Sequence, residues 1–591
     1  MRQPSLALTV KFNADAGLDF ERLDQELERC FALVRNDWDS MAAPGVPGAG
    51  TGRELMARAM ALYPVLARSC RVPCFEIGRI VRVDRLPGNP GQWQARLLLP
   101  ATDLVPRSVF DQLIQHSLAT VAQLATLKPT AAAREALLQQ LHREVAQGLI
   151  QSVHGGISTI PLCEVAHRLG LPLRHVGKGI VQLGWGSAAQ LLDRSACLQD
   201  SGVGARLSGD KHGTAIQLRR AGLPAPVHVQ VSNLERAQSA AAVLGWPLVV
   251  KPADRERGEG VSTGITDASG LELAYRKARR YSPRVLVERQ AAGICHRILV
   301  TDGQVVYAIK RCPKFVLGDG LHSVRELAEA GNRRQLLALP WLRRAPFPLD
   351  AMAADCLRGL GLGLDDVPAP GRYVPLRAIE STEWGGESED VTNRIHPDNA
   401  AAAIDAANLL GLRVAGIDMI AEDLSQPWHE SGAIINEVNF APLFGWNPAT
   451  LERREPFLRR LVRGDGRIPV CAVVGDGELL SRGRAVQAEW VRSGLRCHLT
   501  DSLRTVAPNG REIALTSAGL YARSHALLAR RDVDAIVMVL DTPEFLTTGL
   551  PVDRIDRIER EGSTGTATTQ SLLGLLDCYA SAPAGRGARV I

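Results

Sequence analysis

Lysine is scarce in this sequence. Only eight of its 69 basic residues are lysines, and the others are arginines. No block of basic residues with interleaved aromatics occurs, and the formal net charge of +6 is small for 591 residues, so we expect no nucleic-acid partner. Because lysines are few, the position of each one carries more information than that of an arginine.

Long hydrophobic runs and paired cysteines are also missing. No stretch of about 18 apolar residues occurs, so we expect no membrane span, and the N-terminal segment lacks the pattern of a signal peptide. The eleven cysteines include no Cys-x-x-Cys pair, and Cys70 and Cys74 are the closest two. We therefore expect a cytoplasmic protein whose cysteines are reduced and structural.

The pattern along the chain predicts an α/β (α+β) protein with three domains, since domains hold roughly 100–200 residues. Residues 1–158 combine strand-like and helical segments in a mixed domain. Residues 159–465 alternate short strands with helices, as in an enzyme body. Residues 466–591 begin with a buried strand, a helix and a second buried strand, and we expect a disordered tail from about residue 562.

Two local patterns have plain structural interpretations. Asp302-Gly303 between two apolar runs is typical of an antiparallel hairpin. In the first domain His142, Glu144 and His154 are candidate metal ligands, but their spacing matches no strong ligand pattern. We therefore interpret these three as ordinary polar residues.

Two lysines and a glycine-rich loop indicate a phosphate site. Lys211 precedes a helix in GDKHGT, and Lys251 ends the apolar strand WPLVVKP. The loop DRERGEGVS follows directly and contains Gly258 and Gly260. An ammonium group and loop N–H groups together suit phosphate oxygens. Such a loop alone is often only a turn, but the two lysines make the combination informative.

Acidic and amide side chains on apolar strands extend this pattern. Glu288 ends the apolar strand RVLVE, where it is either a hinge residue that binds ribose hydroxyls or a solvated edge residue. Asp418 lies inside the apolar strand VAGIDMIA, where an unpaired carboxylate would be costly. Glu437 and Asn439 are two positions apart and share one strand face. These three oxygen donors suit Mg²⁺; the alternative is three satisfied polar residues of a mixed sheet.

The order of these residues resembles the ATP-grasp superfamily, and the detail resembles the ligase domain of cyanophycin synthetases. The similar segments are GKGIVQLGWG, GDKHGT, VVKPADRERGEGV, VLVERQAAGICHRILVTDGQVV, KRCPKFVLGDGLHSVRELAE, DVTNRIHPDN, GLRVAGIDMIAEDLS and INEVNFAP. The resemblance is strong over residues 160–465 and weak before them. Residues 466–560 resemble a remnant of the family's Mur-ligase-like domain, in which AVVGDGELLSRG replaces the phosphate-binding loop.

The resemblance implies an ATP-dependent, ADP-forming carboxylate–amine ligase that uses ATP and Mg²⁺. The shortened C-terminus implies the family type that joins β-aspartyl-arginine dipeptides to a peptide polymer primer through an acyl phosphate. Arg311 and Arg377 are the implied catalytic residues that stabilise the acyl phosphate and the oxyanion; for each, the alternative is an ordinary ion pair. We expect a homo-oligomer, because the exposed sheet of a truncated domain needs covering.

Several loops depart from the family pattern. The departing positions are Arg255, Glu256, Arg257, Cys295, Lys310, Glu380, Glu383 and Glu387. One interpretation is that the polymerised unit differs from β-Asp-Arg and that the added carboxylates recognise a cationic side chain; the other is solvated loop charge. Two further alternatives stay open, a ligase that makes a different polymer or short peptide and an inactive scaffold that binds polymer or a partner.

Overall fold

The computed structural model describes residues 3–14, 17–39, 50–89, 91–152, 155–255, 259–377, 380, 385–444, 448–562 and 565–580. The chain divides into two compact units. The larger contains Ser5–Leu162 and Asp193–Phe457, and the smaller contains Met1–Pro4, Cys163–Leu192 and Leu458–Ile591. The α/β fold class is confirmed. The division into three domains at residues 158 and 465 stays a prediction, because the boundaries of the two compact units fall at other residues.

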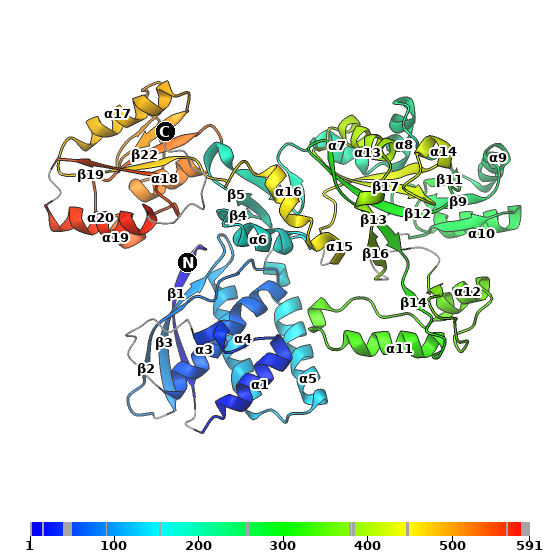
Figure 1. Cartoon of the computed structure of the whole chain (residues 1–591), viewed down its shortest axis with the longest axis horizontal. Coiled ribbons are helices and arrows are strands. Elements are labelled where there is room, and N and C mark those ends of the chain that lie inside the picture. The colour runs from blue at the N-terminus through cyan, green and yellow to red at the C-terminus, as the bar shows by residue number, and fades with distance from the viewer. Residues whose placement is uncertain are drawn as a thin grey trace. The chain divides into compact units, whose positions relative to one another are not determined.

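The first part of the larger unit is a three-stranded antiparallel sheet packed on helices (Figure 1). The strands are, in sheet order, β1 (Ser5–Asn13), β3 (Gln92–Pro100) and β2 (Arg79–Arg85), and the main helices are α1 (Phe20–Phe31), α3 (Thr51–Ser69), α4 (Arg107–Thr126) and α5 (Ala131–Leu141). Alternate strand residues such as Ile80, Leu97 and Leu99 are buried in one core with the helices. This alternation follows from the two-residue period of a strand.

A four-stranded antiparallel sheet comes next in the larger unit. Its strands are, in sheet order, β10 (Ser262–Ile265), β9 (Leu248–Pro252), β11 (Val285–Arg289) and β8 (His228–Val231). One face packs its valines and leucines on α9 (Leu234–Leu244) and α10 (Ala268–Arg279) (Figure 1). By alternation, Lys251 and Glu288 therefore lie on the opposite face.

A five-stranded antiparallel sheet forms the rest of this body. Its strands are, in sheet order, β16 (Glu387–Asp390), β13 (Gln304–Cys312), β12 (Ile294–Thr301), β17 (Val414–Ala421) and β18 (Ile434–Phe440). One face packs on α13 (Pro397–Leu409) through residues such as Ile298 and Ile417. The predicted hairpin between β12 and β13 is confirmed, since Asp302 and Gly303 both have positive φ, 55° and 67°.

A small lobe lies in the chain between β13 and β16. It contains β14 (Phe315–Leu317), α11 (Val324–Gln335), α12 (Ala351–Gly359) and β15 (Tyr373–Pro375) around its own apolar core. A capping box of Ser323 and Glu326 begins α11. After α11, Leu339 and Trp341 pack against the core of the N-terminal helices. The lobe is thus held by its chain connections to β13 and β16 and by this contact with the N-terminal helices.

The smaller unit contains a five-stranded sheet that is parallel except at one edge. The strands are, in sheet order, β21 (Thr505–Val506), β20 (Cys497–Thr500), β22 (Ala535–Val539), β19 (Val470–Gly475) and β23 (Arg557–Glu561). Helix α17 (Leu479–Arg492) packs on one face, and α18 (Leu520–Leu528) and α20 (Ala567–Ala580) pack on the other (Figure 1).

Helix α20 corrects the expected tail. Disorder from about residue 562 is wrong for Ala567–Ala580, because Leu572 and Leu576 lie one turn apart and are buried against the sheet. Residues 581–591 lie outside the described part. Because helices pack on both faces of this sheet, an exposed sheet face is no longer a reason to expect a homo-oligomer, and the oligomeric state stays a prediction.

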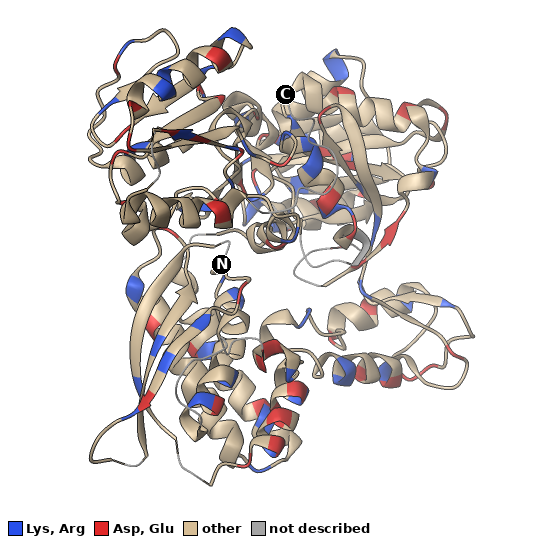
Figure 2. Ribbon diagram, turned by 60° about the vertical axis from the view of Figure 1, so that its left-hand side comes forward, with Lys and Arg blue, Asp and Glu red and all other residues tan. Residues whose placement is uncertain are grey.

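All eleven cysteines are free thiols, and burial raises the pKa of Cys70 and of Cys74 to about 12. No helix in the described residues is both long and apolar enough for a membrane span. Figure 2 shows basic and acidic residues interspersed over the described helices and strands.

Candidate active site

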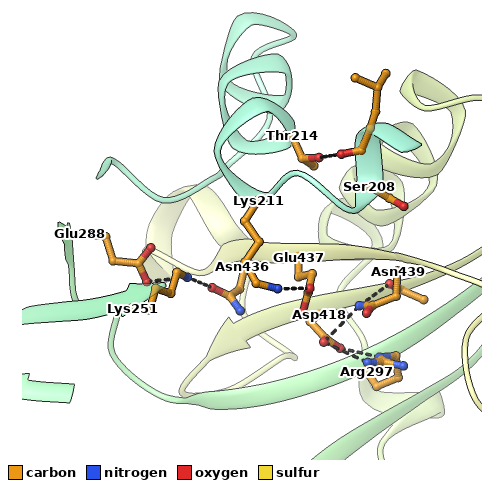
Figure 3. Close-up of polar contacts among 12 residues, drawn as sticks. Ser208, Lys211, Thr214, Lys251, Glu288, Arg297, Asp418, Asn436, Glu437 and Asn439 are labelled. Atoms are coloured by element: carbon orange, nitrogen blue, oxygen red, sulfur yellow. Dashed lines mark hydrogen bonds and ion pairs between the residues drawn. The ribbon is translucent and has the colours of Figure 1, made fainter. Parts of the chain in front are cut away.

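The predicted phosphate-binding lysines lie beside carboxylates between the two middle sheets (Figure 3). Lys211, the first residue of α8 (Lys211–Arg220), places its Nζ 2.5 Å from Glu437 Oε1 on β18. Lys251 Nζ on β9 lies 2.9 Å from Glu288 Oε1 on β11 and 3.3 Å from Asn436 Oδ1 on β18. Residues up to 226 positions apart in the chain are thus neighbours.

A β-bulge on β18 turns two consecutive side chains toward these lysines. Asp418 on β17 is the cross-strand partner of Glu437, but the next residue of β17 pairs with Ile435, so Asn436 is an extra residue. Ile435 and Val438 are buried in the core under the sheet. Asn436 and Glu437 both point to the other face, where Figure 3 shows them bonded to the two lysines.

Asp418 is buried and paired with arginine. Arg297 on β12 donates from Nε and Nη2 to its two oxygens at 2.5 and 3.0 Å, and Asn439 Nδ2 donates at 3.3 Å. Burial, the largest single effect, raises the pKa of Asp418, but the charge and hydrogen bonds of Arg297, the charge of Arg311 and the hydrogen bond from Asn439 together hold the pKa below its ordinary value. The carboxylate is therefore ionised. Arg297 was not predicted as a site residue, although a charged residue within the apolar run HRILV is a signal of the same kind as Asp418.

The three predicted metal ligands are brought together on one sheet face. Asp418 pairs with Glu437 and Gly416 with Asn439 across β17 and β18. Asp418 Oδ2 accepts from both Arg297 and Asn439, but Oδ1 accepts from Arg297 alone and keeps a further lone pair, and hard oxygen donors fit Mg²⁺. No three His, Cys, Asp or Glu residues in the described ranges are grouped to hold a metal, so the fit depends on the Asn439 amide. The metal role stays a prediction.

Glu288 offers an acceptor that nothing in the described chain uses. Its side chain is buried, and Oε1 is paired with Lys251, whereas Oε2 has no hydrogen-bond partner among the described residues. A buried acceptor without a donor is costly. A ligand hydroxyl in this position would satisfy it, which fits the predicted binding of ribose hydroxyls by Glu288.

The structure describes only part of the glycine-rich loop, and that part includes Gly260. Gly260 has φ +72°, and a Cβ there would come within 2.8 Å of Tyr281 Cδ2 and 2.9 Å of Pro252 Cγ. Only glycine fits this backbone without displacing its neighbours. Gly258, together with Glu256 and Arg257, lies outside the described residues, so its predicted contact with a nucleotide stays a prediction.

The two predicted catalytic arginines have different surroundings. Arg311 Nη1 is 3.8 Å from Asp418 Oδ2 and its Nη2 is 2.5 Å from Glu380 Oε2, so Arg311 lies with the predicted metal ligands. Arg377 is buried and donates from Nη1 and Nη2 to Asp350 at 2.9 and 2.8 Å. The ion-pair alternative therefore describes Arg377 well, and both catalytic roles stay predictions.

The added carboxylates of the loops are matched by arginines of the same chain. Glu380 pairs with Arg311, and Glu387 Oε2 lies 3.7 Å from Arg344 Nη1. Glu383 lies outside the described residues. These carboxylates already lie beside arginines of the same chain, so they are less available to bind a cationic substrate. The geometry therefore favours the interpretation that they are ordinary loop charges over the interpretation that they recognise a cationic side chain.

The first domain brings no metal ligands together at the candidate positions. His142 Nε2 lies 3.1 Å from Gln147 Nε2, and Glu144 accepts from Gln140 at 3.1 Å, so both have local partners. His154 lies outside the described residues. The structural interpretation of these residues is therefore retained.

A histidine pair beside Lys211 makes a pH dependence expected. His212 Nδ1 and His228 Nε2 are hydrogen-bonded at 2.7 Å. Burial first, then the charges of His212, Arg219 and Lys251, lower the pKa of His228 from 6.5 to about 4, with Asp210 acting in the opposite direction. The unfolded chain thus takes up a proton at higher pH than the folded chain, so stability falls as the pH is lowered from about 6.5 toward 4.

Replacing His228 with asparagine should flatten this part of the pH profile. Denaturant midpoints measured at pH 7.5, 6, 5 and 4 are expected to fall less steeply in the variant than in the parent. His116→Gln, at a partly exposed histidine on α4, is the matched control and should keep the parental slope. Equal slopes for the parent and His228→Asn would show that His228 is not the titrating group.

Comparison with known proteins gives relatives for slightly more than half of the chain. No family model matches. A cyanophycin synthetase of Nostoc sp. is 31% identical over 334 residues, which cover 54% of this chain and 37% of the relative. A cyanophycin synthetase of Synechocystis sp. is 30% identical over 392 residues, which cover 64% of this chain and 45% of the relative. The chain thus matches less than half the length of these curated relatives.

Among solved structures, a bifunctional glutathione synthetase from Pasteurella multocida aligns with a TM-score of 0.41 and 20% identity, covering 62% of this chain and 65% of that chain. The predicted resemblance to the cyanophycin synthetases is confirmed by the sequence relatives. The assignment to a shortened family type stays a prediction.

Proposed function

We propose, from this homology, that the chain is an ATP-dependent carboxylate–amine ligase that forms ADP and extends a cyanophycin-like polymer. The observation that carries the proposal is the gathering of Lys211, Lys251, Glu288, Asp418 and Glu437 between two antiparallel sheets. These are the residue types that bind nucleotide phosphates, ribose and Mg²⁺. The similarity to cyanophycin synthetases supports the same chemistry.

The proposed reaction has two steps. A carboxylate oxygen of the polymer attacks the γ-phosphorus of ATP, ADP leaves, and an acyl phosphate forms; the amine nitrogen of the incoming unit then attacks the acyl carbon, and phosphate and a proton leave. Lys211 and Lys251 would bind phosphate oxygens, and Arg311 would stabilise the developing oxyanion. Mg²⁺, when bound by the three predicted ligands, supplies positive charge that neutralises the phosphoryl oxygens.

We propose further that the unit added is a preformed β-aspartyl-arginine dipeptide. The support is the end of β19, where the family's second nucleotide loop is replaced by Gly475-Asp476-Gly477. Asp476 accepts from Thr569 there, and Gly477 packs on Glu561. A carboxylate in this turn would repel phosphate, which supports a ligase with one nucleotide site, and a one-site ligase needs its arginine already attached.

The test is a ligation assay with purified protein. ATP, Mg²⁺, a short cyanophycin primer and β-Asp-Arg are incubated, and phosphate release is followed together with product mass. A parallel reaction contains free aspartate and arginine instead. We expect growth in whole dipeptide steps, one phosphate per step, and only with the dipeptide.

Other outcomes lead to the alternatives. Phosphate release without incorporation of the dipeptide would favour a ligase that makes a different polymer or short peptide. No turnover with any amino acid or dipeptide, at any primer length, would favour an inactive scaffold that binds polymer or a partner.

A further inference from the structure

A cavity of about 590 Å³ lies between the edge of the five-stranded sheet and the small lobe. Its floor includes Lys310 on β13, and its wall includes Phe315 and Tyr373 on β14 and β15. Lys310 and Arg311 are consecutive strand residues, so they point to opposite faces of the sheet. Since Arg311 faces Asp418, the Lys310 ammonium faces away from the candidate active site.

The walls of this cavity are mostly apolar. Phe315 and Tyr373 form a tilted ring pair with centroids 4.5 Å apart, and Ile294, Leu317 and Pro375 complete the surface. Leu317 and Tyr373 keep 56% and 43% of their surfaces exposed, although both line the cavity. A volume of this size, with apolar walls and few polar groups, is typical of small-molecule sites.

The charges at the cavity leave one cation without an internal partner. Glu389 is ion-paired with Arg394, and Glu387 lies 3.7 Å from Arg344. Arg377, which also lines the cavity, is held by Asp350. Among the described residues Lys310 forms no ion pair, although Glu389 is its cross-strand neighbour. The cavity therefore offers an ammonium group to a negatively charged ligand.

We propose that this cavity binds a small molecule that has one carboxylate and an apolar or aromatic body, with the carboxylate on Lys310 and the body against Phe315 and Tyr373. A charge-assisted bond to an ammonium gives the polar anchor, and burial against aromatic walls gives the remaining affinity. The cavity shares Arg377 with the predicted catalytic residues, but its anchor Lys310 faces away from Asp418, and the proposal does not depend on the proposed ligase activity.

Indole-3-propionate is a suitable probe of this chemistry, with its neutral amide and the cation tryptamine as matched ligands. Binding to the full chain is measured by calorimetry and by saturation-transfer NMR. We expect the carboxylate to bind with a Kd of about 1 mM or tighter. Lys310→Gln should weaken it about tenfold, because a hydrogen bond to a charged group is lost.

Lys128→Gln, at an exposed lysine outside the cavity, should bind like the parent. Binding of a fluorescent ADP analogue should be the same in the parent and in Lys310→Gln, so a change at the nucleotide site is recognised separately. Lack of carboxylate binding at several millimolar, equal affinity for the amide or tryptamine, or equal affinity of parent and Lys310→Gln would each overturn the proposal.

Discussion

Replacing Glu437 with glutamine should lower ATP-dependent ligation about 100-fold or more, because a metal that stabilises charge on the transferring phosphoryl group contributes several kcal/mol to the barrier. Glutamine keeps the size of the side chain and removes the negative charge. The side chains of Lys211 and Glu437 are 17% and 24% exposed, but a glutamine oxygen can still accept a hydrogen bond from Lys211, so stability should fall by only about 1 kcal/mol. The measurement is the initial rate of ADP formation with primer and dipeptide, together with the denaturant midpoint.

A matched control is available on the preceding helical turn. Glu430→Gln changes the same residue type at an exposed position outside the site and should keep the parental rate. A Glu437→Gln protein that ligates at more than one tenth of the parental rate would remove Glu437 from the metal site, whereas loss of rate with a lowered midpoint would point to misfolding instead.

Replacing Asp418 with alanine should destabilise the larger unit by about 3–5 kcal/mol, since the guanidinium of Arg297 would stay buried without its counter-charge. The side chain of Asp418 is 6% exposed and that of Arg297 15%, so water reaches neither freely. Equilibrium denaturation followed by tryptophan fluorescence measures the change, and the low-stability transition of the variant is assigned to the larger unit by limited proteolysis.

Asp302→Asn is the control for this ion pair, because asparagine removes the charge and tolerates the positive φ at this turn position. Asp302 also accepts two bonds from one arginine, Arg413, at 2.8 Å each, but its side chain is 44% exposed, so less than about 1 kcal/mol should be lost. The double variant Asp418→Leu/Arg297→Leu should recover most of the stability, because apolar residues often replace a buried ion pair at little cost. Equal effects of Asp418→Ala and Asp302→Asn would contradict the argument from burial.

Local sequence patterns were sufficient for those site residues whose environment is set by their own strand or loop. Lys251 and Asp418 are charged residues inside apolar runs, and a charge in such a run needs a partner or a ligand. The Asp302-Gly303 turn needs two residues that tolerate positive φ. In each case the physical constraint acts within about ten residues, so the sequence alone contains it.

The missed features depend on register and on distant segments. Asn436 reaches the site only because of the bulge, and simple alternation would place it in the core. Arg297 becomes the partner of Asp418 through the pairing of β12 with β17, which no local pattern encodes. The bidentate contact between Arg377 and Asp350 joins residues 27 positions apart across the lobe, so a catalytic interpretation was equally compatible with the sequence.

The extra residue on β18 also limits how this segment can evolve. A strand of alternating side chains tolerates substitution at each position, but the loss or gain of one residue exchanges its two faces. Within Ile434–Phe440, deletion of Val438 would make Glu437 and Asn439 adjacent and so turn one of them toward the hydrophobic interior. Among descendants of this chain, selection would therefore conserve the length of the segment more strictly than the identity of its buried aliphatic residues.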